Sequence, residues 1–121
     1  RDSFFKVKEF AEEAGRDLPS NYTFACFIYT ALYDDIADAR ERAVAELKYR
    51  YGQEFDHLVD KYCGYGPPTR IAEYLQKYIE AGANYLILAP IMPPEDRRSH
   101  LERYAEQVLP VLEGMEPGKV L

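Results

Sequence analysis

The stretch AGANYLILAPI, residues 81–91, decides the fold of this chain. Gly82 ends a helical pattern, an almost unbroken apolar and aromatic run follows, and Pro90 ends that run. Such a run between glycine and proline is typical of a strand buried on both faces, and strands of this kind lie among parallel neighbours in α/β proteins. The sequence therefore predicts a buried parallel strand over residues 84–90.

The rest of the chain contains one further strand pattern among helical patterns. Residues 22–31 are rich in aromatic and β-branched residues without a helical period, which predicts a second strand. Apolar residues at helical spacing, bounded by capping residues, glycines and prolines, predict helices. These cover a first segment ending near Gly15, two helices over residues 34–62 that Gly52 separates, one helix over 68–81, and one over 97–113 that Pro110 is expected to kink or restart near its end. The stretch CGYGPP, residues 63–68, is expected to be a sharp loop.

This order of elements predicts an α/β fold of parallel strands with flanking helices. A sheet of only two strands is too small to be stable when both of its faces are buried. We therefore expect residues 1–121 to form a single partial domain. It is either the end of something larger or a subunit that borrows strands from a partner.

Composition and charge exclude several classes of partner. The net charge is −6, and lysines and arginines are scattered among carboxylates, so we expect neither nucleic acid nor an anionic membrane as a partner. No apolar run approaches the roughly 20 residues of a membrane span, and no signal-peptide pattern opens the chain. Two cysteines, Cys26 and Cys63, are too few for a disulfide framework, which indicates a cytoplasmic protein.

The sequence predicts neither a metal site nor a known catalytic motif. Cys63, His57 and His100 lack the spacing of zinc ligands. Both histidines lie in charged helical surroundings, which is typical of surface residues. The chain contains no glycine-rich dinucleotide fingerprint, no phosphate-binding loop and no nucleophile elbow.

Several short motifs, taken in order, resemble the last part of the luciferase-like flavin-dependent oxidoreductases. The likeness covers nearly the whole chain. It includes a proline-bearing helix start, an amphipathic helix that ends in Glu-Ala-Gly-Ala, an apolar strand and a helix that ends in Val-Leu-Pro. The matching segments are FAEEAGRDLPS (residues 10–20), GPP (66–68), EAGA (80–83), YLIL (85–88) and VLP (108–110).

The resemblance implies the last quarter of a (β/α)8 barrel, with residues 22–31 and 84–90 as the seventh and eighth strands. A full barrel takes about 250 residues. The resemblance also implies oxidoreductase or monooxygenase chemistry on a small organic substrate, with FMN or, in one branch, a deazaflavin as the cofactor. Most of what holds the flavin in this family comes from earlier strands. We therefore expect the isolated chain to be inactive, and to bind the cofactor weakly or not at all.

Four residues are candidates for a cofactor site. Function in barrels lies at the carboxyl ends of strands, which points to Tyr29 and Tyr33 as hydrogen-bonding partners of a flavin edge or a substrate. Ordinary packing under loops is the alternative for both tyrosines. Gly66 and Thr69 belong to a helix start, where free amides and the helix dipole suit a phosphate. A plain helix start is the alternative there, because Pro67 replaces a hydroxyl residue that is frequent in the family.

Two other functions remain open. The chain could be a stand-alone interaction module without catalytic activity, whose strand edges and apolar inner face pair within a homo-oligomer. It could also be a small anion-binding domain that uses the helix start at residues 66–69. In either barrel or module, we expect association with further copies or with the missing barrel portion, because the inner faces of two lone strands need a cover.

Overall fold

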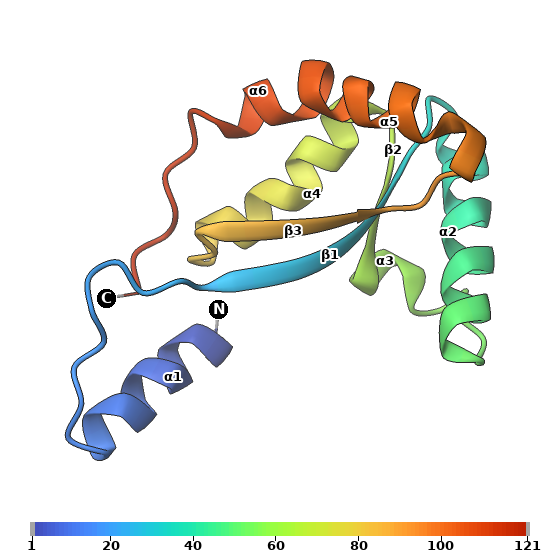
Figure 1. Cartoon of the computed structure of the whole chain (residues 1–121). Coiled ribbons are helices and arrows are strands. Elements are labelled where there is room, and N and C mark those ends of the chain that lie inside the picture. The colour runs from blue at the N-terminus through green and yellow to red at the C-terminus, as the bar shows by residue number, and fades with distance from the viewer. Residues whose placement is uncertain (1, 121) are drawn as a thin grey trace.

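The protein contains a three-stranded parallel sheet flanked by helices, as the computed structural model of residues 2–120 shows (Figure 1). The strands are β1 (Ala25–Leu32), β2 (Cys63–Gly66) and β3 (Tyr85–Pro90), in the spatial order β2-β1-β3. The α-helices are α1 (Asp2–Glu13), α2 (Ile36–Tyr51), α3 (Val59–Tyr62), α4 (Pro68–Glu80), α5 (Arg97–Arg103) and α6 (Leu109–Leu112). A 3-10 turn, η1 (Pro94–Asp96), precedes α5, and a π-helical turn, η2 (Tyr104–Val108), joins α5 to α6. The predicted α/β class with parallel strands is confirmed.

The two strands that the sequence predicts are neighbours in the sheet. β1 and β3 pair in parallel, with a register that runs from Ala25 opposite Tyr85 to Thr30 opposite Pro90. Asn84 extends this pairing beyond the strands, because its side-chain oxygen accepts a hydrogen bond from the Phe24 amide at 2.8 Å. The strand predicted over residues 22–31 begins three residues later than expected, at Ala25.

The expectation of a loop over residues 63–68 is wrong in its first part, where β2 forms. All four residues of β2 are buried, and the strand pairs in parallel with β1 from Tyr29 opposite Cys63 to Leu32 opposite Gly66. Two glycines in four residues give little intrinsic preference for a strand, so pairing with β1 decides its conformation. Gly64 also has a packing role, because a Cβ there would lie 2.6 Å from the Tyr74 ring.

The helices end where the glycine and proline signals predict. The predicted helix over residues 34–52 forms as α2 and stops at Tyr51, because Gly52 adopts a left-handed conformation with φ of 65° and its amide caps Lys48 O. The shorter helix expected after it is reduced to one turn, α3. The helix expected over 97–113, which Pro110 is expected to kink or restart, changes to a π-helical turn, in which the Leu109 amide bonds to Tyr104 O. Pro110 follows and has no amide hydrogen to continue the regular ladder.

Helices cover both faces of the sheet, which we name by the helix that packs on each. On the α4 face, Ile28 and Leu32 of β1 pack against residues of α4 and η2. On the α2 face, Ala31 of β1 packs against residues of α2, β2 and the segment that precedes α3. The α4-face cluster contains Ile71, Leu75, Tyr104 and Val108, and the α2-face cluster contains Ala39, Ala43, Leu47, Phe55 and Val59.

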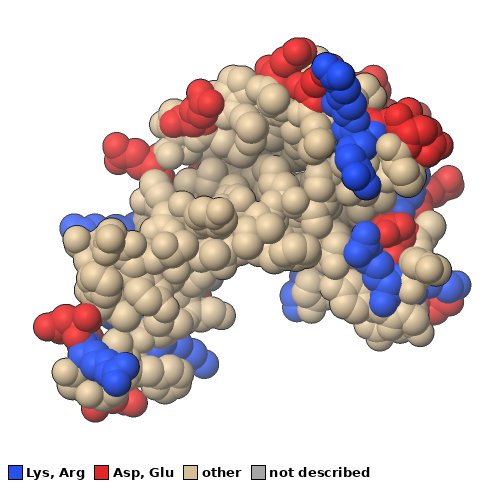
Figure 2. Space-filling view, in the orientation of Figure 1, with Lys and Arg blue, Asp and Glu red and all other residues tan. Residues whose placement is uncertain are grey.

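The α2 face is only half covered. Phe27 of β1 is 61% exposed, and Tyr85 and Ile87 of β3, which share its face, are 58% and 43% exposed. We call these three residues the open strip. Figure 2 shows an uncharged surface over β1 and β3, with charged side chains gathered over α1, α2 and α5. The prediction that residues 84–90 are buried on both faces is wrong, because β3 is an edge strand and α2 reaches only the carboxyl half of β1.

Helix α1 adds little cover to the sheet. No described residue of α1 is buried, and Phe10 on its apolar side is 62% exposed. A ring contact of 4.8 Å joins Phe4 to Phe24, just before β1. Figure 1 shows α1 lying apart from the other helices, at the opposite end of β1 from α2.

Candidate functional site

The carboxyl ends of β1 and β3 meet in a crevice of about 400 Å³. The chain leaves β1 toward α2 on one face and leaves β3 toward α5 and η2 on the other. In open parallel sheets, ligands bind where neighbouring strands send their connections to opposite faces. The residues that line this strand-end crevice include Tyr33, Arg42, Glu46, Arg50, Ile91 and Met92.

Tyr33, a predicted site residue, forms part of the crevice wall. Its hydroxyl donates a hydrogen bond of 3.1 Å to Ile91 O, and the Arg42 guanidinium lies 4.4 Å from the centre of its ring. Burial raises the pKa of Tyr33, and the neighbouring Arg42 charge opposes that shift. The phenol is therefore neutral at pH 7 and has already committed its proton, so it can accept a hydrogen bond from a ligand but is not a proton donor.

The charges of the crevice are paired within α2. Arg42 Nε lies 3.2 Å from Asp38, and Arg50 Nε lies 2.7 Å from Glu46, each pair being one helical turn apart. Both guanidinium groups are thus partly neutralised before any ligand arrives. The crevice suits an uncharged polar group better than a phosphate.

His100 packs against Tyr33 but does not itself line the crevice. Its Nε2–H donates to Leu32 O at 3.2 Å, and its ring meets the Tyr33 ring edge-on at 5.1 Å between centroids. The prediction that His100 is a surface residue is wrong, because α5 folds back over the end of β1 and leaves the ring half-buried.

Gly66 lies close to Tyr33, whereas Thr69 does not join the site. The Tyr33 amide donates to Gly66 O at 3.0 Å, which joins the ends of β1 and β2. Gly66 has a φ of 121°, and a Cβ there would lie 2.7 Å from Arg70 Cδ, so glycine is required at this turn. Thr69 is exposed on the first turn of α4.

The start of α4 offers few donors to an anion. Pro67 and Pro68 have no amide hydrogen, and the amides of Arg70 and Ile71 both donate to Pro67 O, at 3.0 and 3.1 Å. A phosphate site at a helix start needs free amides that point outward. The geometry therefore favours the plain helix start among the two readings of residues 66–69.

Tyr29 lies away from the strand-end crevice. It lies four residues before Tyr33, and its hydroxyl shares a 3.1 Å hydrogen bond with the Tyr51 hydroxyl of α2. This bond is the main cause of a raised pKa for Tyr29. The four predicted site residues thus fall into three places, with only Tyr33 and Gly66 in contact.

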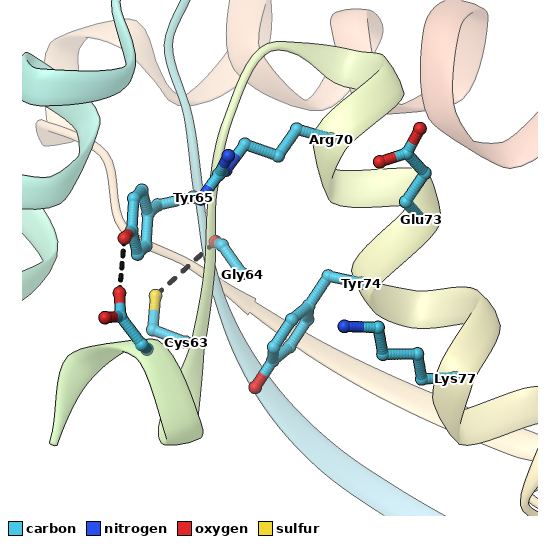
Figure 3. Close-up of a pocket in the computed structure, with 8 residues that line it drawn as sticks. Cys63, Gly64, Tyr65, Arg70, Glu73, Tyr74 and Lys77 are labelled. Atoms are coloured by element: carbon cyan, nitrogen blue, oxygen red, sulfur yellow. Dashed lines mark hydrogen bonds between the residues drawn. The ribbon is translucent and has the colours of Figure 1, made fainter.

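A second cleft, of about 320 Å³, follows the free edge of β2 (Figure 3). Arg70, Glu73 and Lys77 reach into it from α4, and the Arg70 guanidinium lies 5.1 Å from the centre of the Tyr65 ring. The Tyr65 hydroxyl donates to the Asp60 carboxylate. Burial raises the pKa of the Cys63 thiol to about 12, so this cysteine is not a nucleophile at neutral pH.

Neither cleft contains a catalytic pair of a nucleophile and a base among residues 2–120. Within the same part of the chain, no group of three or more His, Cys, Asp or Glu residues is placed to hold a metal ion. None of the described helices combines the length and apolar character that crossing a membrane requires. No protein-family model matches the chain, and neither does any curated protein.

The contribution of α2 to the crevice was missed from the sequence. The spacing of Asp38 and Arg42, and of Glu46 and Arg50, predicts ion pairs on a helix surface. That spacing does not predict which strand end the helix surface lies beside. The position of α2 depends on the face of the sheet to which the chain crosses after β1.

Proposed function

We propose that this chain is the closing portion of a luciferase-like flavin-dependent oxidoreductase or monooxygenase that acts on a small organic substrate. In this proposal β1 and β3 are neighbouring strands of a (β/α)8 barrel, and α4 and α5 are outer helices. FMN or a deazaflavin is the cofactor of the complete enzyme. The isolated chain does not catalyse the reaction.

The open strip is the observation that carries this proposal. In a barrel, one face of each strand packs against outer helices and the other fills the interior. β1 and β3 have this asymmetry: Ile28 and Leu32 are buried under α4 and η2, whereas Phe27 and Ile87 on the opposite face are exposed. An apolar face of two parallel strands is the surface that further barrel strands would cover.

The positions of the family-like motifs support the same proposal. Residues 66–68 join β2 to α4, residues 80–83 end α4 with Gly82 at a φ of 113°, and residues 85–88 lie in β3. The first two motifs thus lie at boundaries where a β/α unit needs a specific backbone conformation, and the third forms the strand itself.

The residues of this chain could contact the ring system of a flavin but could not hold its phosphate. The strand-end crevice has about 400 Å³, but its arginines are paired with carboxylates and the start of α4 offers few free amides. A bound flavin would supply the redox chemistry. This chain would contribute the crevice wall and exclude water, and the phosphate of FMN must be held by residues outside it.

The coding sequence upstream of Arg1 tests this proposal. We expect it to continue the reading frame with six further β/α units, and the complete protein to oxidise reduced FMN or a reduced deazaflavin. Residues 1–121 alone serve as the inactive control. A start codon close to Arg1, together with no binding of either cofactor in a fluorescence titration, would contradict the proposal.

A stand-alone oligomerisation module is the second candidate. The order β2-β1-β3 favours it, because β2 occupies the edge of β1 where a sequential barrel would place its preceding strand. The packing of α2 on the face opposite to α4 also agrees with an open sheet. In this case the open strip is covered by a second copy of the chain.

A further inference from the structure

We propose that a cleft on the α2 face binds an uncharged, planar aromatic compound that carries a hydrogen-bond acceptor. The cleft has about 390 Å³ and lies between β1, the end of α2 and α3. We call it the aromatic cleft. Its walls and floor include Phe27, Tyr29, Leu47, Tyr51, Phe55 and Tyr62. This inference does not depend on the flavin proposal.

The lining of the aromatic cleft differs from that of the other two clefts. No charged side chain lines it, whereas Asp60, Arg70, Glu73 and Lys77 line the cleft beside β2. A charged ligand would lose hydration there, and the nearest cations, Arg50 and Lys61, lie over the Tyr29 and Tyr62 rings and not among the lining residues. Ligand pockets of this size in proteins are mostly apolar, with a few polar groups that orient the ligand.

The aromatic rings form a continuous series from the sheet to α3. Centroid distances along it are 5.3 Å from Phe27 to Tyr29, 6.3 Å from Tyr29 to Tyr51, 5.4 Å from Tyr51 to Phe55 and 6.3 Å from Phe55 to Tyr62. Aromatic rings prefer tilted and edge-to-face contacts at such distances. A flat ring placed among them finds ring faces and edges on several sides.

The floor of the aromatic cleft is part of the buried core, and its walls are exposed to solvent. Leu47 and Phe55 belong to the buried cluster of the α2 face, whereas Phe27, Tyr51 and Tyr62 are exposed. A ligand that covers these three rings removes apolar surface from water without requiring the core to move.

The Tyr29–Tyr51 pair offers one hydroxyl proton to orient the ligand, beside the Tyr62 hydroxyl and the Gln53 amide that also line the cleft. Tyr29 and Tyr51 share a single hydrogen bond, so one of their two protons is used and the other is free to donate. The Tyr78 hydroxyl offers no such proton: Tyr74 donates to Lys61 O and therefore receives the proton of Tyr78. The donors in the aromatic cleft thus come from the Tyr29–Tyr51 pair, Tyr62 and Gln53, and they call for an acceptor on the ligand.

Quinoline and naphthalene test this inference as a matched pair of probes. Both are planar two-ring molecules, but only quinoline has an acceptor, its ring nitrogen, which is unprotonated at neutral pH. We titrate each probe into the isotope-labelled chain, below the concentration at which the chain associates, and follow its NMR spectra. We expect saturable shifts at Tyr51, Phe55 and Tyr62, and binding of quinoline about fivefold tighter than that of naphthalene. Naphthalene-1-sulfonate should bind more weakly than naphthalene.

Variants separate stacking from hydrogen bonding. Tyr62→Ala should weaken both probes about fivefold, whereas the control Tyr49→Ala on α2, at a side chain that is 86% exposed and outside the cleft, should change neither. The double variant Tyr29→Phe/Tyr51→Phe should keep naphthalene binding and reduce the preference for quinoline. Absence of saturable binding, shifts confined to other surfaces, or an unchanged preference in the double variant would overturn the proposal.

Discussion

The two faces of the sheet differ in how much of their apolar surface is covered by helices. On the α4 face, Ile28 and Leu32 of β1 are buried beneath α4 and η2. On the α2 face, the carboxyl half of β1 is buried beneath α2, but Phe27 near its amino end faces water together with Tyr85 and Ile87 of β3. The same strands therefore carry one completed core and one apolar surface that still lacks a cover.

This difference predicts that the α4 face contributes most to stability and that any association uses the α2 face. Burial of apolar area stabilises the folded chain in rough proportion to the area removed from water. The α4 face already has this contribution within one chain. The open strip can gain it only from another chain or from further strands, as both proposals for function require.

The largest expected effect comes from neighbouring residues of β1 that point to opposite faces. Ile28→Ala should lower the free energy of unfolding by about 2–5 kcal/mol, because it leaves a cavity under α4. Phe27→Ala should cost less than about 1 kcal/mol, because its ring is already exposed. Urea unfolding followed by circular dichroism measures both. Equal losses would mean that the α2 face is as well covered as the α4 face.

A second effect concerns alkaline pH and Tyr104 on the α4 face. Burial raises the pKa of Tyr104 to about 12, above its ordinary value near 10. The folded chain therefore keeps the proton that the unfolded chain loses, so this stability is present below pH 10 and is lost as the pH rises to about 12. The loss should reach roughly 2 kcal/mol at pH 12.

The variant Tyr104→Phe isolates this alkaline effect. Its free energy of unfolding, measured in urea from pH 9 upward, should decline less steeply than that of the unmodified chain. The raised pKa of Cys63 acts in both proteins, so the difference between the two curves reports Tyr104 alone. Parallel curves would place the Tyr104 hydroxyl in water instead of in the core.

The smallest effect compares one tyrosine hydroxyl on each face at pH 7. Tyr104→Phe removes a 2.7 Å hydrogen bond to the fully buried Thr30 hydroxyl and should cost about 1–2 kcal/mol. Tyr29→Phe removes the exposed bond to Tyr51 and should cost a few tenths of that. Adding Thr30→Val to Tyr104→Phe should restore part of the loss, since no buried polar group is then left unpaired. A costly Tyr29→Phe would contradict an open α2 face.

The strands β1 and β3 were predictable because their signals are local. Their apolar runs have boundaries in the sequence, such as Gly82 and Pro90. β2 was not predictable, since two glycines in CGYG indicate a turn and only pairing with β1 makes it a strand. The end of α2 was also predictable, because Gly52 follows its apolar stripe and adopts the left-handed conformation that ends a helix.

The candidate site was predictable only where it depends on strand ends. Tyr33 lies at the carboxyl end of β1, as expected, and meets Ile91 after β3. Tyr29 was assigned to the same site. In the structure α2 packs over Tyr29, and the Tyr51 hydroxyl of α2 shares a hydrogen bond with the Tyr29 hydroxyl. The side to which a connection crosses is a property of the whole sheet, and no short segment of sequence carries it.

The central claim is that the open strip on the α2 face lacks a cover within one chain. The mass of the chain in solution tests this claim most directly. Light scattering or sedimentation should give a mass that rises with concentration above the 14.0 kDa of one chain. Ile87→Glu places a charge in the open strip and should return the mass to that of one chain with an unchanged circular dichroism spectrum. A monodisperse mass of 14.0 kDa for the unmodified chain at every concentration would contradict the account.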